Sequence, residues 1–128
     1  MIEPNFLSVA RVELLHQKSI DRFGGTQGIR DRGLFESAIN QPKHTFHYAH
    51  GDLFDIAAAY AFHIAEAQAC LDGNKRTDVA AALAFLELNG VSSDFDSLPL
   101  YEAMIAVAKK EMDKAELAVK LRKLCTSD

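Results

Sequence analysis

The chain has 128 residues, of which 48% are hydrophobic and 25% are charged, and it carries a formal net charge of −4. This length and composition predict a single globular domain over residues 1–128. The negative net charge argues against a protein that coats nucleic acid, because such a protein needs a basic face. We therefore expect no direct nucleic-acid partner.

The cysteine content and the apolar segments bear on the cellular compartment. Two cysteines, Cys70 and Cys125, are too few for a disulfide framework, which favours a reducing environment. The first five residues lack the basic start and the apolar core of a signal peptide. The longest Ala-rich segment, residues 56–69, is too short to span a bilayer. These features predict a cytoplasmic protein without a membrane partner.

Helical spacing of apolar residues and capping signals predict three helices in the first half of the chain. The first begins after Ser8, a good N-cap, and ends at Gly24-Gly25. Asp31 can cap a second helix, which we expect to end at Pro42 because proline disfavours helix in the residue before it. A third helix opens near Asp52.

The second half of the chain shows three more helical patterns. One follows Thr77 and ends at Asn89-Gly90, a pair that readily adopts the left-handed conformation of helix ends. Another opens at Leu98-Pro99, with proline in the first turn. The last begins at Asp113, which forms a capping-box pattern with Glu116. Six helices with short connections predict an all-α fold, a compact six-helix bundle.

Residues 43–50 are the only part of the chain with a β preference. The aromatic residues Phe46 and Tyr48 favour a short extended hairpin. The same stretch carries three evenly spaced histidines, His44, His47 and His50. On a helix their spacing would gather them on one face, as a zinc site requires, whereas in a hairpin His47 opposes the other two. We expect solvated histidines here, and a metal-binding protein using these three residues is the alternative.

The polar run Asp72–Thr77 lies between two apolar helical segments and reads as a loop that feeds a helix N-terminus. Free backbone N–H groups and the helix dipole favour an anion at such a position. Gly73 permits close approach of a ligand, Lys75 and Arg76 suit phosphate oxygens, and Asp72 can hold Mg²⁺. The ordinary alternative is a solvated turn. Cations at a helix N-terminus oppose the dipole, which favours the anion site.

The motif Asp72–Thr77, followed by Phe85–Gly90, resembles the Fic/Doc superfamily and, within it, the death-on-curing (Doc) toxins. Further landmarks appear in the family's order and cover almost the whole chain. They are Phe6-Leu7, Phe23–Gly25, Gly28–Asp31, Leu34–Ala38 and Asp52–Phe54.

The resemblance implies an all-α domain whose central helix–loop–helix binds a nucleoside triphosphate such as ATP together with Mg²⁺, and which transfers part of that nucleotide to a hydroxyl of a target protein. By position, Asp72 resembles the metal-binding acid, Gly73 and Asn74 the anion-cradling turn, and Arg76 the phosphate clamp. Lys75 stands where AMP-transferring members usually have glycine. In Doc-like members, lysine there accompanies transfer of the terminal phosphate to a translation elongation factor.

The chain departs from the family motif at its start. The motif opens with His, a variable residue and Phe, and here these positions are Gln68, Ala69 and Cys70. In the family that His is the general base, and a Gln amide cannot accept and hold a proton near neutral pH. Because Gln68 can still form hydrogen bonds, binding can survive where transfer is impaired. We expect neither Cys70 nor His63, about 140° away on one helix, to replace the base.

The resemblance also implies partners. The stretch containing His44, Phe46, His47 and Tyr48 corresponds to the family's flap, which clamps the target by strand pairing. No internal inhibitory motif of the family occurs in the chain, so a separate antitoxin protein is the expected partner. The sequence thus predicts a Doc-like toxin component with impaired transfer. The alternative is an active ATP-dependent transferase that places phosphate or AMP on a Ser or Thr hydroxyl of a translation factor.

Overall fold

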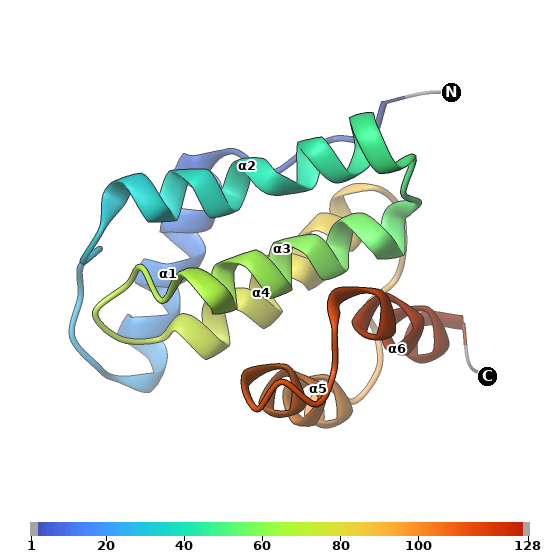
Figure 1. Ribbon diagram of the computed structural model, residues 1–128. Coiled ribbons are helices and arrows are strands. Elements are labelled where there is room, and N and C mark those ends of the chain that lie inside the picture. The colour runs from blue at the N-terminus through green and yellow to red at the C-terminus, as the bar shows by residue number, and fades with distance from the viewer. Residues whose placement is uncertain (1–2, 127–128) are drawn as a thin grey trace.

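The computed structural model describes residues 3–126, which contain six α-helices and no strands. Their bounds are α1 Val9–Phe23, α2 Arg32–Ala49, α3 Leu53–Ala67, α4 Asn74–Leu88, α5 Leu98–Ala108 and α6 Lys114–Thr126. The predicted all-α, six-helix fold is confirmed (Figure 1). None of the described helices is both long and apolar enough to cross a membrane.

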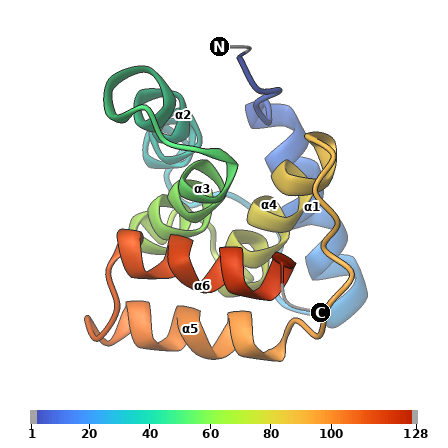
Figure 2. The ribbon, with the colours of Figure 1, turned by 90° about the vertical axis from the view of Figure 1, so that its right-hand side faces the viewer.

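Helix α3 occupies the centre of the molecule. It contacts α2 and α4 on its flanks and rests on the pair formed by α5 and α6 (Figure 2). Residues 57–59 and Ala61 are all alanines with no exposed surface, so the neighbouring helices approach α3 closely on every side. A helix that is apolar over most of its surface is a core helix. Tyr60 fills the remaining space, and its hydroxyl oxygen accepts a 2.8 Å hydrogen bond from Leu7 N–H.

Local capping explains where four of the six described helices start. Ser8, Asp31 and Asp52 each accept hydrogen bonds from the first turn of the helix that follows, as predicted. The expected capping box of Asp113 and Glu116 is present, with reciprocal side-chain to backbone hydrogen bonds of 2.8 and 3.2 Å. These contacts satisfy N–H groups that a helix start otherwise leaves without partners.

Two predicted features are wrong at residues 42–50. Helix α2 does not end at Pro42 but continues to Ala49, so the stretch expected to form a flap hairpin is the end of a helix. Pro42 is buried and extends the apolar face of Phe35 and Ile39, and Phe46 then packs edge-on against Phe6 at 6.0 Å between ring centroids. Burial of this face outweighs the roughly 3 kcal/mol that proline costs inside a helix.

The fourth helix begins one turn earlier than predicted, at Asn74 rather than after Thr77. Its N-cap is Gly73, which adopts the left-handed conformation with φ of 76°. The motif Asp72–Thr77 therefore supplies the first turn of α4 as well as the loop before it.

Candidate functional site

The loop joining α3 to α4 packs against the loop joining α1 to α2, at the end of α3 from which α4 continues (Figure 1). Ile29 and Cys70 form an isolated antiparallel bridge. Around it, Arg30 N–H donates to the Ala69 carbonyl at 2.7 Å and Leu71 N–H donates to the Gly28 carbonyl at 3.1 Å. Residues distant in sequence thus hold the motif in one backbone conformation.

Gln68 caps the C-terminus of α3 in the left-handed conformation, with φ of 47°. Its exposed side chain folds back, and Nε2 donates a 2.7 Å hydrogen bond to the Ala65 carbonyl. The Gln68 carbonyl accepts a hydrogen bond from the Arg30 guanidinium. The amide oxygen of Gln68 therefore stays available at the cleft described below.

Asp72 is held by two contacts that leave part of its carboxylate free. Its Oδ2 accepts a 2.7 Å hydrogen bond from Thr26 N–H, and its backbone carbonyl accepts one, also 2.7 Å, from Nε2 of His16. Because a carbonyl can only accept, His16 carries a proton on Nε2. His16 is 1% exposed and anchors the loop from α1.

Gly73 and Asn74 shape the turn in different ways. The φ of Gly73, 76°, favours glycine, and a Cβ there would also displace the Ile20 Cδ1 methyl, which lies 2.9 Å from its position. The Asn74 side chain bonds both ways with the Cys70 backbone, accepting from N–H and donating to C=O at 3.0 Å each. Its amide thus closes the loop, and only its backbone N–H faces an incoming anion.

No side-chain hydrogen bond caps α4 within the described chain. The N–H groups of Asn74, Lys75 and Arg76 therefore lie outside the helix hydrogen-bond ladder and carry the positive end of its dipole. Lys75 is exposed. Arg76 is half-buried, with its guanidinium 5.0 Å from the centroid of the Phe23 ring and a 3.4 Å hydrogen bond to the Gly24 carbonyl.

These residues line one cleft of about 550 Å³. It is bordered by Gln68, Leu71, the motif residues Asp72, Gly73, Asn74, Lys75 and Arg76, and Tyr101 of α5. The structure thus brings together all the residues expected to bind phosphate and metal, along with the position of the family's base. A free carboxylate, two cations and an uncapped helix start converge on it, which is a donor set suited to a phosphate group with Mg²⁺.

Sequence reasoning missed Asp78, which lies one turn into α4. The side chain is 2% exposed, and its Oδ1 has no hydrogen-bond partner within residues 3–126. Burial raises its pKa from 3.8 to about 8, against the opposing effects of the Val79 backbone and the Lys75 charge. The available signal was an acidic residue beside the apolar positions Val79 and Ala82, which the helical pattern places in the core.

Tyr101 and His16 also went unnoticed in the sequence, because only tertiary packing brings Tyr101 to the cleft and His16 to the Asp72 carbonyl. Burial raises the pKa of Tyr101, and the nearby Asp78 charge adds to that effect. Nothing in the spacing of either residue distinguishes it from an ordinary helical position.

The two side chains considered as replacement bases do not line the cleft. His63 faces α6, where its Nε2 lies 3.2 Å from the Lys114 ammonium, and burial followed by the Lys114 charge lowers its pKa to about 4. Cys70 is 3% exposed, and burial raises the pKa of its thiol to about 11. A thiol with that pKa stays protonated near neutral pH.

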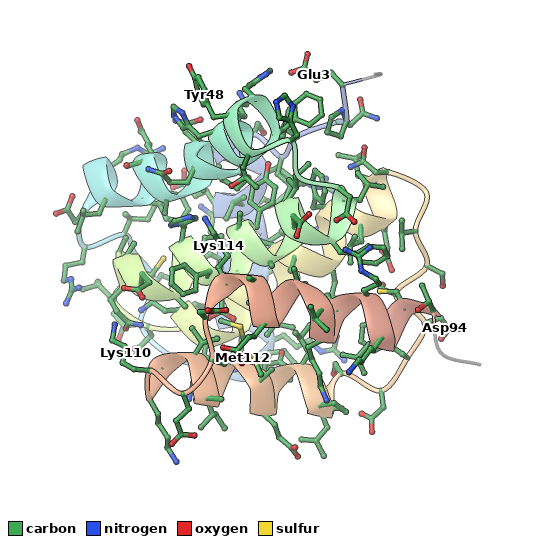
Figure 3. All side chains as sticks on the ribbon, turned by 45° about the vertical axis from the view of Figure 1, so that its right-hand side comes forward. Glu3, Tyr48, Asp94, Lys110, Met112 and Lys114 are labelled. Carbon is green, nitrogen blue, oxygen red and sulfur yellow. The ribbon has the colours of Figure 1, made fainter. Side chains whose placement is uncertain are left out.

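The residues predicted to form the flap lie in the last turns of α2, near the start of α3. Gln68 lies at the other end of α3, which at 1.5 Å per residue is roughly 20 Å long. Figure 3 shows Tyr48 extending from the end of α2, on the side of the molecule away from Lys110, which lies just beyond α5.

The three histidines of this region do not form a metal centre. His44 stacks on Tyr48 at 5.7 Å between centroids, and His47 lies 3.6 Å from Glu3 Oε1. His50 caps α2 in the left-handed conformation. Among residues 3–126 no group of three or more His, Cys, Asp or Glu side chains is arranged to hold a metal ion, so the zinc alternative is not supported.

Comparison with known proteins identifies relatives over most of the chain. A sequence model of the Fic/DOC family matches residues 6–86. The protein named Toxin Doc from Mycolicibacterium smegmatis is 40% identical over 103 residues, which cover 77% of this chain and 79% of the relative. The protein named Protein kinase doc from Escherichia phage P1 is 36% identical over 111 residues, covering 86% of this chain and 87% of the relative.

Proposed function

This chain belongs to the Fic/DOC family, and we propose that it is a Doc-like toxin component of a toxin–antitoxin module. In this proposal it binds nucleotide phosphate and Mg²⁺ through Asp72–Arg76, and Gln68 leaves it impaired in group transfer. The name of the mycobacterial relative supports the toxin assignment. A toxin needs restraint, so the expected partner is a cognate antitoxin protein.

The observation that carries the proposal is the cleft at the start of α4. Lys75 and Arg76 line it beside backbone N–H groups that have no capping side chain. Two cations at a helix N-terminus oppose the dipole and repel each other, and a polyanion in the cleft relieves both effects. Each charge-assisted hydrogen bond to phosphate contributes about 1.5–3 kcal/mol.

The residues at the cleft also fit a magnesium ion. Asp72 keeps carboxylate capacity beyond the single hydrogen bond that Oδ2 accepts from Thr26. Mg²⁺ in nucleotide sites commonly takes one or two carboxylates, with substrate phosphates and water completing its octahedron. ATP with Mg²⁺ supplies an activated phosphate or AMP group, while the chain's own residues orient it: Asp72 toward the metal, Lys75 and Arg76 toward the phosphates.

Gln68 determines the predicted loss of activity. A carboxamide donates and accepts hydrogen bonds but does not take up a proton near neutral pH. Losing a general base costs roughly 10²–10⁴-fold in rate, while phosphate binding at Lys75 and Arg76 does not depend on it. We therefore infer a protein that still binds nucleotide but transfers its phosphate or AMP group slowly.

Active transfer is the second candidate function. It is favoured by the relative named as a protein kinase, which shares 36% of its aligned residues with this chain. The acceptor would be a Ser or Thr hydroxyl of a translation factor. Incubation with labelled ATP, Mg²⁺ and a cell extract decides between the two: label transferred by the wild-type protein would favour the active enzyme.

Isothermal titration calorimetry with ATP and Mg²⁺ tests binding. We expect Lys75→Met to weaken binding by about ten- to a hundredfold, because it removes a charge-assisted contact. Lys123→Met, which removes an exposed charge on α6, is the matched control and should bind like the wild type. Absence of heat in the wild-type protein, or equal affinities for the two variants, would refute the phosphate site.

A further inference from the structure

Lys75 forms part of the wall between two cavities. Besides the phosphate cleft, a smaller inner pocket of about 220 Å³ lies between the end of α3, the start of α4 and the end of α5. Gln68 and Lys75 border both cavities, and Asp78 borders only the inner pocket. The Lys75 ammonium can thus be directed to either side.

The Asp78 carboxyl group is only partly satisfied, because the Val79 backbone hydrogen-bonds to it while one of its oxygens has no partner among the described residues. It is 2% exposed, and none of the described residues hydrogen-bonds to its Oδ1. An unsatisfied buried polar atom costs about 1–3 kcal/mol, so the fold gains nothing from it. A buried ionisable group with one unsatisfied oxygen, bordering a cavity beside a binding cleft, points to a functional role.

The charged groups around the inner pocket leave Lys75 as the natural partner of Asp78. Glu66 and Lys110 also border this pocket and pair with each other at 3.5 Å, both exposed (Figure 3 shows Lys110). On α5, the pKa of Tyr101 is raised in part by the Asp78 charge, but a tyrosine side chain cannot supply a cation. Lys75 lies three residues before Asp78, on the same face of α4, and its positive charge lowers the pKa of Asp78.

We propose that Asp78 is a positioning residue for Lys75, and that its charge decides whether the Lys75 ammonium serves the anion in the cleft or turns to the inner pocket. This rests on the proposed phosphate site. Neutral Asp78 leaves Lys75 free for the cleft. Ionised Asp78 draws Lys75 inward, because a carboxylate that is 2% exposed attracts a nearby cation more strongly than one in bulk water.

The expected consequence is proton-linked anion affinity. Burial raises the pKa of Asp78 to about 8, so the group changes charge just above neutral pH. Below this range Lys75 contributes to the phosphate cleft, and above it the contribution is lost. Loss of one charge-assisted contact corresponds to about a tenfold fall in affinity.

Titration with sulfate, followed by amide NMR, tests this, because sulfate keeps its charge over the range used. For the wild type we expect affinity to fall about tenfold between about pH 7 and about pH 9. The Asp78→Asn protein should bind sulfate across this pH range with the affinity that the wild type shows at neutral pH. Glu66→Gln, which alters the other carboxylate at the pocket, should behave like the wild type.

The Lys75→Met variant separates positioning from direct repulsion of the anion by Asp78. If Asp78 acts through Lys75, the variant binds weakly at every pH with a flat profile. A profile as steep as that of the wild type would overturn the proposal, as would an Asp78→Asn protein whose affinity still falls.

A measurement without ligand tests the coupling of Asp78 to Lys75 separately from the proposed phosphate site. Carbon NMR of the Asp78 carboxyl group should give a higher pKa in Lys75→Met than in the wild type, because the favourable cation is gone. If no variant binds sulfate while this shift appears, the phosphate site fails and the coupling of Asp78 to Lys75 stands. Identical Asp78 titrations in both proteins would overturn the coupling itself.

Discussion

Replacing Asp78 with asparagine should stabilise the protein at neutral pH and have little effect in acid. The pKa of Asp78 is raised from 3.8 to about 8 by burial, so the folded protein holds this proton more tightly than the unfolded chain. By linkage, the contribution of Asp78 to stability is highest below about pH 4 and falls as pH rises toward about 8, where the loss is complete. Asparagine has the same shape and does not titrate.

The size of the effect follows from the same two values. In the unfolded chain the Asp78 carboxyl group is fully ionised at pH 7, about three pH units above its pKa of 3.8. In the folded protein it is still mostly protonated at that pH. At about 1.4 kcal/mol per unit, the wild type loses about 4 kcal/mol that Asp78→Asn retains. Neutral Asp and Asn leave similar polar groups buried, so that cost cancels. The gain is a large part of a typical domain stability of about 5–15 kcal/mol.

Urea denaturation followed by circular dichroism measures this difference. The gap between Asp78→Asn and the wild type should be near zero at about pH 4 and should widen steadily to about pH 8. Asp94→Asn, the same substitution at an exposed residue, provides the control and should show no such trend. A gap that does not change with pH would refute the reasoning, because it would mean that Asp78 is ionised in the folded protein at its ordinary pKa.

Three further substitutions test the geometry of the turn and the missing base. Gly73→Ala should lower stability by about 1–2 kcal/mol, mainly because alanine is strained at φ of 76°; the Ile20 Cδ1 methyl, 2.9 Å from the added Cβ, can move aside at little cost, and an unchanged thermal midpoint would contradict this. Asn74→Ala removes two hydrogen bonds to the Cys70 backbone and should lower the free energy of unfolding by about 1–3 kcal/mol. An unchanged midpoint of urea denaturation would contradict this. Gln68→His should raise labelled-phosphate transfer by roughly 10²–10⁴-fold, and no gain despite retained ATP binding would show that more than the base is missing.

The starts of the first three helices were predictable because capping is local. Ser8, Asp31 and Asp52 lie next to the helices they cap, so a few consecutive residues contain the whole signal. Pro42 was misleading because its local preference competes with burial of a helix face against residues far away in the sequence. The predicted hairpin failed for the same reason, since the β preference of residues 43–50 is weaker than the packing of Phe46 on Phe6.

The motif was recognisable in the sequence because its residues are contiguous, and the cleft unites them at one helix start. Roles within it depend on contacts that only the structure reveals. Asn74, expected to form part of an anion-cradling turn, uses its side chain to close the loop onto the Cys70 backbone. Asp78 and His16 come from helix faces that seemed ordinary, and their significance depends on a missing partner in one case and a distant carbonyl in the other.

The most direct test of the phosphate cleft is an amide NMR titration of the wild-type protein with ATP and Mg²⁺. We expect the largest shifts at the N–H groups of Asn74, Lys75 and Arg76, which lie outside the hydrogen-bond ladder at the start of α4, with smaller shifts at Gln68. Shifts that instead gather at another helix start, such as that of α6, or spectra that do not change at millimolar nucleotide, would contradict the account.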